Sequence, residues 1–129
     1  MMDVLVVDDD RAAAEALSMR LTHAGISVAT ATNGQDAIRL FIAEHPRVVL
    51  LDAALPDISG PQICQYMKSS ATSVAPVVVM VSGASTPTPD YVQRCSEASG
   101  ADHFISKPYD GPSLTALVQE LLERMAEPV

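Results

Sequence analysis

The stretch Val48-Val49-Leu50-Leu51-Asp52 decides the fold, because four apolar residues in it run directly into a single carboxylate. The next residues, 53–60, include two alanines, a Pro-Asp pair and a Ser-Gly pair, which is the composition of a loop. A continuous apolar run bounded by turn residues is typical of a strand that is buried on both faces of a sheet. We therefore expect a central strand, with Asp52 at the rim of the sheet where the strand ends.

Four further segments have the composition of strands. Residues 3–7 and 77–81 are almost wholly apolar and belong beside 48–51 in the middle of a sheet. Residues 26–31 alternate between apolar and polar side chains, and residues 103–105 are few, so these two segments belong at the edges.

A segment with helical spacing of apolar residues separates each strand from the next and follows the last one. Each begins at residues typical of a helix start, where a side chain accepts hydrogen bonds from the free N–H groups of the first turn or a proline occupies that turn. These starts are the aspartates 8–10, Asn33 with Asp36, Gly60-Pro61, Thr88-Pro89 and Asp110. Strict alternation of strand and helix gives a parallel sheet with helices on both faces. The predicted fold class is α/β, a flavodoxin-like (βα)5 three-layer sandwich with the five strands in the order 2-1-3-4-5.

Length and composition fit one domain. The chain has 129 residues, 48% of them hydrophobic. We expect a single domain over 1–129, with frayed termini at 1–2 and 126–129. No apolar run approaches the roughly 18 residues of a membrane span, and no signal-peptide pattern opens the chain, so we expect a cytoplasmic protein without a membrane segment.

Charge and cysteine content narrow the function further. The net charge is −8 and no cluster of Lys or Arg exists, which argues against direct nucleic-acid binding. The two cysteines, Cys64 and Cys95, lie far apart and suit free thiols in a reducing compartment.

Polar residues follow four of the predicted strands, namely Asp8-Asp9, Asp52, Ser82 and Lys107. Parallel strands bring these ends to one rim, and ligands of such sheets bind there, between strands 1 and 3. Three carboxylates in one pocket either raise a pKa or hold a cation, and an all-oxygen set suits Mg²⁺ or Mn²⁺. A lysine ammonium and a serine hydroxyl beside them complete the groups needed for phosphoryl transfer to an aspartate.

From end to end, the chain resembles the receiver domain of two-component response regulators. The residues that carry the resemblance are Asp8-Asp9, Asp52, Pro56 and Gly60, Ser82, Phe104, and Lys107-Pro108.

The resemblance implies a role for each of the polar residues. Asp52 would accept a phosphoryl group from a histidine kinase or a histidine phosphotransfer protein. Asp9 and Asp52 would bind Mg²⁺ directly together with the backbone carbonyl of Ala54, while Asp8 would orient a metal-bound water. The remaining two, Lys107 and Ser82, would hold the phosphoryl oxygens.

The resemblance also implies a switch. Ser82 would move toward the phosphoryl group and Phe104 would turn inward, so that the surface of the fourth helix, fifth strand and fifth helix changes for a downstream output domain or protein. The apolar stripe on the last helix packs mainly into the core, and its exposed margin offers a surface for a phosphorylation-dependent dimer. The Lys107–Pro108 peptide would be cis.

Two features depart from the family pattern. Small alanines stand at Ala54 and Ala84, beside the path of the attacking water, so the phosphoryl lifetime is open in either direction. Phe104 lacks the hydroxyl of the tyrosine that many relatives have, so we expect a mostly inward ring.

Several residues have a simpler interpretation. We interpret Asp10 as a helix cap rather than a ligand, and Asp57 as part of a Pro-Asp turn. The three histidines, at 23, 45 and 103, share no spacing suited to a metal, so we expect them on the surface.

Two rival functions remain open at this point. A haloacid-dehalogenase-like phosphatase would use Asp8 as its nucleophile, but no acidic pair follows Lys107 after another apolar strand. A pseudo-receiver would bind its partner without phosphorylation, against which the intact acidic pocket argues. The main hypothesis is a signalling switch that catalyses only its own phosphorylation and dephosphorylation.

Overall fold

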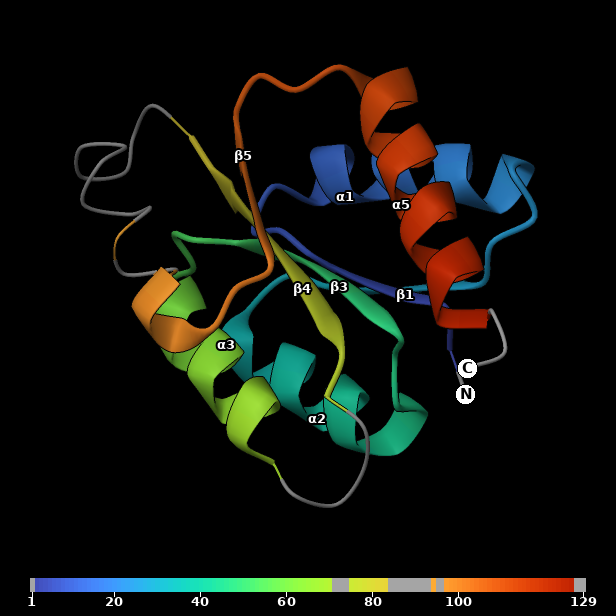
Figure 1. Cartoon of the computed structure of the whole chain (residues 1–129). Coiled ribbons are helices and arrows are strands. Elements are labelled where there is room, and N and C mark those ends of the chain that lie inside the picture. The colour runs from blue at the N-terminus through green and yellow to red at the C-terminus, as the bar shows by residue number, and fades with distance from the viewer. Residues whose placement is uncertain (1, 71–74, 84–93, 95–96, 127–129) are drawn as a thin grey trace.

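The computed structural model describes residues 2–70, 75–83, 94 and 97–126 and contains a five-stranded parallel sheet between two layers of helices (Figure 1). The strand order is β2-β1-β3-β4-β5, which confirms the predicted fold class. The strands are β1 (Val4–Val7), β2 (Val28–Ala31), β3 (Val48–Asp52), β4 (Val77–Ser82) and β5 (His103–Ser106).

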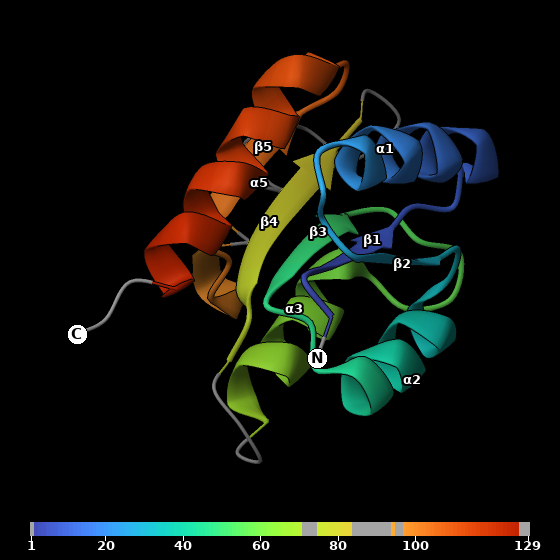
Figure 2. The ribbon, with the colours of Figure 1, turned by 90° about the vertical axis from the view of Figure 1, so that its right-hand side faces the viewer.

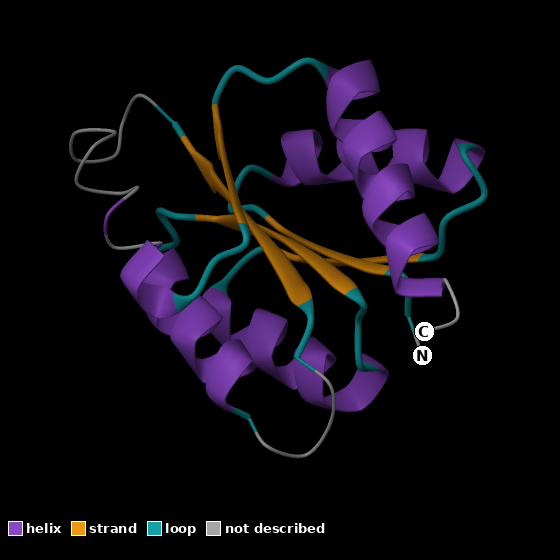
Figure 3. Ribbon diagram, in the orientation of Figure 1, coloured by secondary structure: helices purple, strands orange, loops and turns teal. Residues whose placement is uncertain are grey.

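Helices cover both faces of the sheet. They are α1 (Arg11–His23), α2 (Gly34–Glu44), α3 (Gly60–Ser69) and α5 (Gly111–Ala126). The view in Figure 2 separates α1 and α5 on one face from α2 and α3 on the other. Figure 3 shows the helices on both sides of the central sheet. Along the chain, strands and helices alternate from β1 to β4, and α5 follows β5, as expected for right-handed β–α–β crossovers.

The predicted fourth helix lies only partly within the described residues. Its expected start at Thr88 and Pro89 is outside them. Arg94 and residues 97–99 are helical. Gly100 follows with a φ of 94°, a left-handed conformation that glycine adopts readily, so the predicted end at Gly100 is confirmed.

Side-chain caps begin the helices where the sequence predicts them. Oδ1 of Asp10 accepts a hydrogen bond from the N–H of Ala13 at 3.2 Å at the start of α1. Asn33 and Asp36 pair in both directions at the start of α2, at 2.8 and 3.1 Å. Oδ2 of Asp110 accepts from the N–H of Ser113 at 2.9 Å before α5.

The start of α3 contains a feature that the sequence analysis did not identify. Ser59 and Gln62 form a capping box, with Pro61 in the first turn as predicted. The box orients the helix that follows the loop after β3.

The sheet divides the core into two clusters, because strand side chains alternate between its faces. In β3, Val49 and Leu51 pack toward α2 and α3, whereas Val48 and Leu50 pack toward α1 and α5. Nearly every residue of β1, β3 and β4 is buried, as predicted for central strands. Each fully buried Val or Leu contributes about 1.5–3 kcal/mol of hydrophobic stabilisation. The rim that carries Asp52 is therefore supported by three almost wholly buried central strands.

The last helix packs by the predicted stripe, with its centre buried and its margins half-exposed. Leu114, Val118 and Leu121 are buried, whereas Leu117, Leu122 and Met125 are partly buried against the same cluster.

The ends of the chain fall partly outside the described residues. Met2 donates its N–H to the carbonyl of Glu44 at 3.0 Å and accepts from the N–H of Arg47 at 3.1 Å, so it is attached to the fold. At the other end, α5 continues to Ala126.

Candidate functional site

Four strands deliver polar side chains to the carboxyl edge of the sheet. Asp8 follows β1 directly, Asp52 and Ser82 are the last residues of β3 and β4, and Lys107 follows β5 directly. Because the strands are parallel and in register, these positions meet at one rim, as the sequence predicts.

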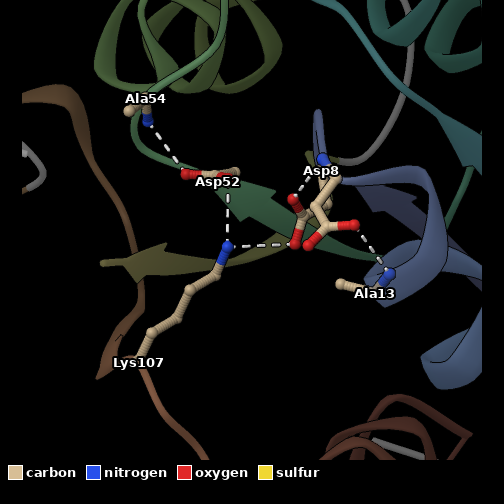
Figure 4. A network of polar contacts seen from close by, with 6 residues as sticks. Asp8, Ala13, Asp52, Ala54 and Lys107 are labelled. Carbon is tan, nitrogen blue, oxygen red and sulfur yellow. Dashed lines mark hydrogen bonds and ion pairs between the residues drawn. The ribbon is translucent and has the colours of Figure 1, made fainter. Parts of the chain in front are cut away.

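The ammonium of Lys107 lies between two buried carboxylates. Its Nζ atom is 3.1 Å from Oδ2 of Asp8 and 3.2 Å from Oδ2 of Asp52, and Figure 4 shows it reaching both. The backbone N–H of Lys107 also donates to the carbonyl of Ser82 at 2.7 Å, which fixes the start of the side chain. The lysine thus neutralises part of the negative charge of the pocket.

The remaining oxygens of these two carboxylates accept backbone N–H groups. Oδ1 of Asp52 accepts from Ala54 at 2.9 Å, and Oδ1 of Asp8 accepts from Asp10 at 2.9 Å. Asp52 and Asp8 are only 5% and 6% exposed. Both side chains are therefore held in fixed orientations by backbone N–H groups of the segments that follow β3 and β1.

Burial and charge shift the protonation equilibria of the pocket. Burial raises the pKa of Asp52 and outweighs the lowering effects of the Ala54 N–H and of Lys107, while the charge of Asp8 raises it further. For Lys107, burial lowers the pKa, but the hydrogen bonds and charges of Asp8 and Asp52 outweigh it and leave the pKa raised. The lysine is consequently a permanent positive charge at neutral pH.

The acidic residues at the rim fit a hard cation. Asp8, Asp9 and Asp52 each offer a carboxylate oxygen, and these atoms lie within 4.8 Å of one another. Asp9 is exposed while the other two are buried, so the group is open to solvent on one side. Such a set, with oxygen ligands and room for water, suits Mg²⁺ or Mn²⁺ better than a metal that prefers nitrogen or sulfur.

Gly60 allows a close backbone contact beneath the loop after β3. A Cβ atom at this position would lie 2.6 Å from the carbonyl oxygen of Asp52 and 2.6 Å from Cα of Ala53. The N–H of Gly60 donates to the carbonyl of Ala53 at 3.0 Å, and the N–H of Ala53 donates to Val81 at 2.8 Å. The family resemblance pointed to Gly60, but this close contact between the two ends of the loop could not be seen in the sequence.

Asp57 has partners that the sequence analysis did not identify. We interpreted it as part of a Pro-Asp turn, and it does accept from the N–H of Ile58 at 2.9 Å. Its carboxylate also accepts from Gly34 at 2.7 Å and from Gln35 at 3.0 Å, both in the first turn of α2. The turn interpretation is thus incomplete, because a local pattern carries no information about a helix more than twenty residues away.

The two expected switch residues lie on adjacent strands. Ser82 is buried, and Phe104 is half-buried against the cluster that faces α2 and α3. In the register, Phe104 is opposite Met80, two residues before Ser82, and Ser82 is opposite Ser106. Ala84 lies outside the described residues.

Smaller expectations have mixed outcomes. The Lys107–Pro108 peptide is cis. Cys64 is a buried free thiol, while Cys95 is outside the described part of the chain. His23 and His45 are exposed as predicted, but His103 is half-buried because it opens β5.

One residue near the site was missed altogether. Tyr109 follows the cis proline and is half-buried against the α1–α5 side of the core. Burial raises the pKa of Tyr109, and the charge of Asp8 raises it further. The only hint in the sequence was its position directly after Lys107-Pro108.

The comparisons with known proteins agree with this geometry. The family model for the response regulator receiver domain matches residues 4–119. The chain belongs to the receiver domain family. Members of this family are signalling switches of two-component systems and bind Mg²⁺ at an acidic pocket, here the cluster of Asp8, Asp9 and Asp52.

Relatives of the receiver domain include longer regulators. It is 33% identical to the response regulator MprA of Mycolicibacterium vanbaalenii, over 94% of this chain and 50% of the relative. It is also 33% identical to the transcriptional regulatory protein AfsQ1 of Streptomyces coelicolor, over 96% of this chain and 52% of the relative. The chain spans about half the length of the curated relatives that it matches.

Solved structures share its fold. The BeF3-activated DrrB receiver domain superposes with a TM-score of 0.82 at 31% identity and covers 96% of this chain and 99% of that one. The receiver domain of a signal transduction histidine kinase from Syntrophus aciditrophicus gives a TM-score of 0.86 at 26% identity and covers 100% and 96%. Within the described residues, no helix has the length and apolar character needed to cross a bilayer.

Proposed function

We propose that this receiver domain accepts a phosphoryl group on Asp52. One observation carries the proposal: Asp52 lies beside two further carboxylates and within 3.2 Å of the Lys107 ammonium. The donor is a phosphohistidine of a histidine kinase or of a histidine phosphotransfer protein. Its N–P bond breaks as a carboxylate oxygen of Asp52 forms the new O–P bond, and the product is an acyl phosphate plus the free histidine.

Two groups of residues support the transfer. Asp9 and Asp52, together with the backbone carbonyl of Ala54, would hold Mg²⁺ directly, and Asp8 would orient a water on it. The ion would supply positive charge for the oxygens of the transferring group. Lys107 moves from its ion pairs with the carboxylates to a phosphoryl oxygen. The hydroxyl of Ser82 donates to another.

The same event changes the partner-binding surface. When Ser82 is drawn toward the phosphoryl group, space opens along β4, and the half-buried ring of Phe104 on the neighbouring strand turns inward to fill it. Such a change biases a two-state surface formed by the segment before β5, by β5 itself and by α5. An output domain or protein, or a second receiver domain in a phosphorylation-dependent dimer, binds the altered surface.

The wider setting is also part of the proposal. Residues 1–129 form one receiver domain that works in the cytoplasm and switches without classical enzymatic turnover of a substrate. Its net charge of −8 gives it no affinity of its own for nucleic acid. A role in gene regulation would therefore pass through an output partner, as the names of longer relatives suggest.

The rival functions find less support in the pocket. A phosphatase that used Asp8 as its nucleophile finds no acidic pair after Lys107 in the sequence to complete its site. The partners of Asp8 and Asp52 are equivalent, since each accepts one backbone N–H and pairs with Lys107. A pseudo-receiver has no need for three carboxylates and an ammonium in one pocket, since the mutual repulsion of the carboxylates costs stability.

Labelling with acetyl phosphate in the presence of Mg²⁺ tests the proposal. Intact mass and peptide mapping should place one acyl phosphate on Asp52, and D52N should remain unlabelled while D8N retains its folded structure. An adduct on Asp8 would support the phosphatase instead. A folded wild-type protein that takes up neither acetyl phosphate nor beryllofluoride would support the pseudo-receiver.

A further inference from the structure

We propose that Asp57 is a positioning residue for the metal and phosphoryl site, because its carboxylate ties the β3–α3 loop to the first turn of α2. The effect of Asp57 on the metal and phosphoryl site rests on the proposed function, whereas its role in tying the loop to α2 does not. The loop in question, residues 53–59, carries Ala54, whose N–H binds Asp52 and whose carbonyl is the proposed third protein ligand of Mg²⁺.

The contacts of Asp57 reach a different element of the fold. Oδ1 accepts from the N–H of Gly34 at 2.7 Å, and Oδ2 accepts from the N–H of Gln35 at 3.0 Å. Oδ1 also accepts from Ile58 at 2.9 Å, which holds the carboxylate in place at its own end. A carboxylate beside a helix N-terminus is also favoured by the helix dipole. These bonds make the pKa of Asp57 lower than usual, with the Gly34 N–H as the main cause, so the group is ionised at neutral pH.

The packing at Gly34 shows how close this junction is. A Cβ atom there would lie 2.9 Å from Cβ of Ile58, 3.0 Å from Oδ1 of Asp57 and 3.0 Å from Cδ1 of Ile63. The backbone of α2 therefore rests directly on the loop, and even an alanine at 34 would push the two apart.

The rest of the loop has few other polar anchors. Its first residue, Ala53, is held by Val81, and Gly60 at its far end is held by Ala53. Between them, within the described part of the chain, the bond from Ala54 to Asp52 joins residues 54–58 to β3, and the hydrogen bonds of Asp57 are the ones that join them to α2. Asp57 is thus placed to fix the loop three residues beyond Ala54.

Helix capping alone does not account for this arrangement. The first turn of α2 already has its own cap, since Oδ1 of Asn33 accepts from the N–H of Asp36 at 2.8 Å. Asp57 takes the two preceding N–H groups of the same turn, Gly34 and Gln35, which a cap at Asn33 leaves free. The two residues stabilise the same helix end, but only Asp57 connects it to the loop.

This difference supplies a matched control. D57A removes the tether and some helix stabilisation, whereas N33A removes helix stabilisation and leaves the tether in place. D57N is the conservative variant, because its amide oxygen can accept one of the two N–H groups. It also serves if D57A does not fold.

The decisive readout is amide hydrogen exchange at Ala54 in the metal-free, unphosphorylated protein, since this N–H is bound only if the loop positions it against Asp52. After correction for the change in global stability, the exchange rate of the Ala54 N–H should be about three- to tenfold higher in D57A than in wild type. The corrected rate of D57N should lie between these two. In N33A the same corrected rate should stay within about twofold of wild type.

The consequence for the site is read from a Mg²⁺ titration followed by amide chemical shifts. The half-saturating Mg²⁺ concentration should increase about three- to tenfold in D57A and stay within about twofold in N33A. Equal effects of D57A and N33A, or an unchanged Ala54 exchange rate in D57A, would overturn the inference. If wild type failed to bind Mg²⁺ or to label at Asp52, the proposed function would fail, while the exchange data would still decide the role of Asp57.

Discussion

The Nζ atom of Lys107 lies 3.2 Å from Oδ2 of Asp52, although the two residues are 55 positions apart in the chain. The same atom pairs with Asp8, so one ammonium balances two buried carboxylates. Removal of the lysine leaves both acids without their cation.

We therefore expect K107M to lower the free energy of unfolding by about 1–2 kcal/mol without Mg²⁺, a value reduced for the partial exposure of the lysine. Added Mg²⁺ should recover more stability in K107M than in wild type, because the cation neutralises the same carboxylates. Urea unfolding with and without Mg²⁺ measures both effects.

The only other lysine in the chain provides the control for this experiment. Lys68 pairs with Asp102 far from the acidic pocket. K68M should show the same Mg²⁺ response as wild type. The interpretation of Lys107 fails if Mg²⁺ stabilises K107M no more than K68M.

Asp52 should cost stability at neutral pH. Its pKa in the folded protein is raised, chiefly by burial, so the folded state is disfavoured once the carboxyl ionises and regains stability as the pH falls and the proton returns. D52N should consequently be more stable than wild type at pH 7, on the order of 1 kcal/mol, and the gain should shrink toward acid pH. Urea midpoints across a pH series test this, and a gain that grows at low pH would contradict it.

The opposite effect on stability at neutral pH is expected at Asp57, which serves as the comparison. The hydrogen bond from Gly34 is the main cause that lowers its pKa, so the ionised form stabilises the fold above the unfolded pKa. D57N should therefore be less stable than wild type at pH 7. This loss should disappear as the pH falls through the folded pKa of Asp57.

Substitution of Asp9 should weaken Mg²⁺ binding without changing the stability of the metal-free protein. It is the exposed member of the acidic group, whereas Asp8 and Asp52 are buried. D9N should leave metal-free stability nearly unchanged, while wild type gains about 1.4 kcal/mol at a Mg²⁺ concentration ten times Kd and D9N gains much less. Thermal unfolding with increasing Mg²⁺ gives the comparison, and an equal rise in Tm for both proteins would remove Asp9 from the proposed ligand set.

Two glycines near the site should respond differently to an added methyl group. At Gly60 a Cβ would meet backbone atoms of Asp52 and Ala53 at 2.6 Å, so G60A must displace the loop at a cost of about 1–3 kcal/mol. It should also slow phosphorylation of Asp52. At Gly83 the nearest atom to a Cβ is Cδ of Lys107 at 3.5 Å, an ordinary contact, so G83A should be far milder in both assays. Similar losses in the two variants would contradict this reading.

The sequence predicted the elements of the fold and most of the site for a clear physical reason. Apolar strands that end in polar residues place those residues at one rim, so Asp8, Asp52, Ser82 and Lys107 could be identified from their positions alone. The caps at Asp10, Asn33 and Asp110 were also predictable, because a capping bond joins residues only three apart.

Long-range geometry was not predictable in this way. The bonds from Asp57 to α2 and the contact of Gly60 with Asp52 depend on how elements pack, which spacing along the chain does not encode. Tyr109 and the half-buried position of His103 were missed for the same reason, since each depends on a neighbour supplied by another element.

The division of the core by the sheet has a thermodynamic consequence. Leu21 lies in the cluster beneath α1 and α5, and Met67 lies in the cluster beneath α2 and α3, so the two side chains share no partner. Energetic effects of substitutions at such separate positions add, whereas those of neighbours within one cluster do not. Each half of the interior can therefore accumulate changes without compensation in the other half. This gives the chain two independent ways to adjust its stability while the acidic rim above keeps its arrangement.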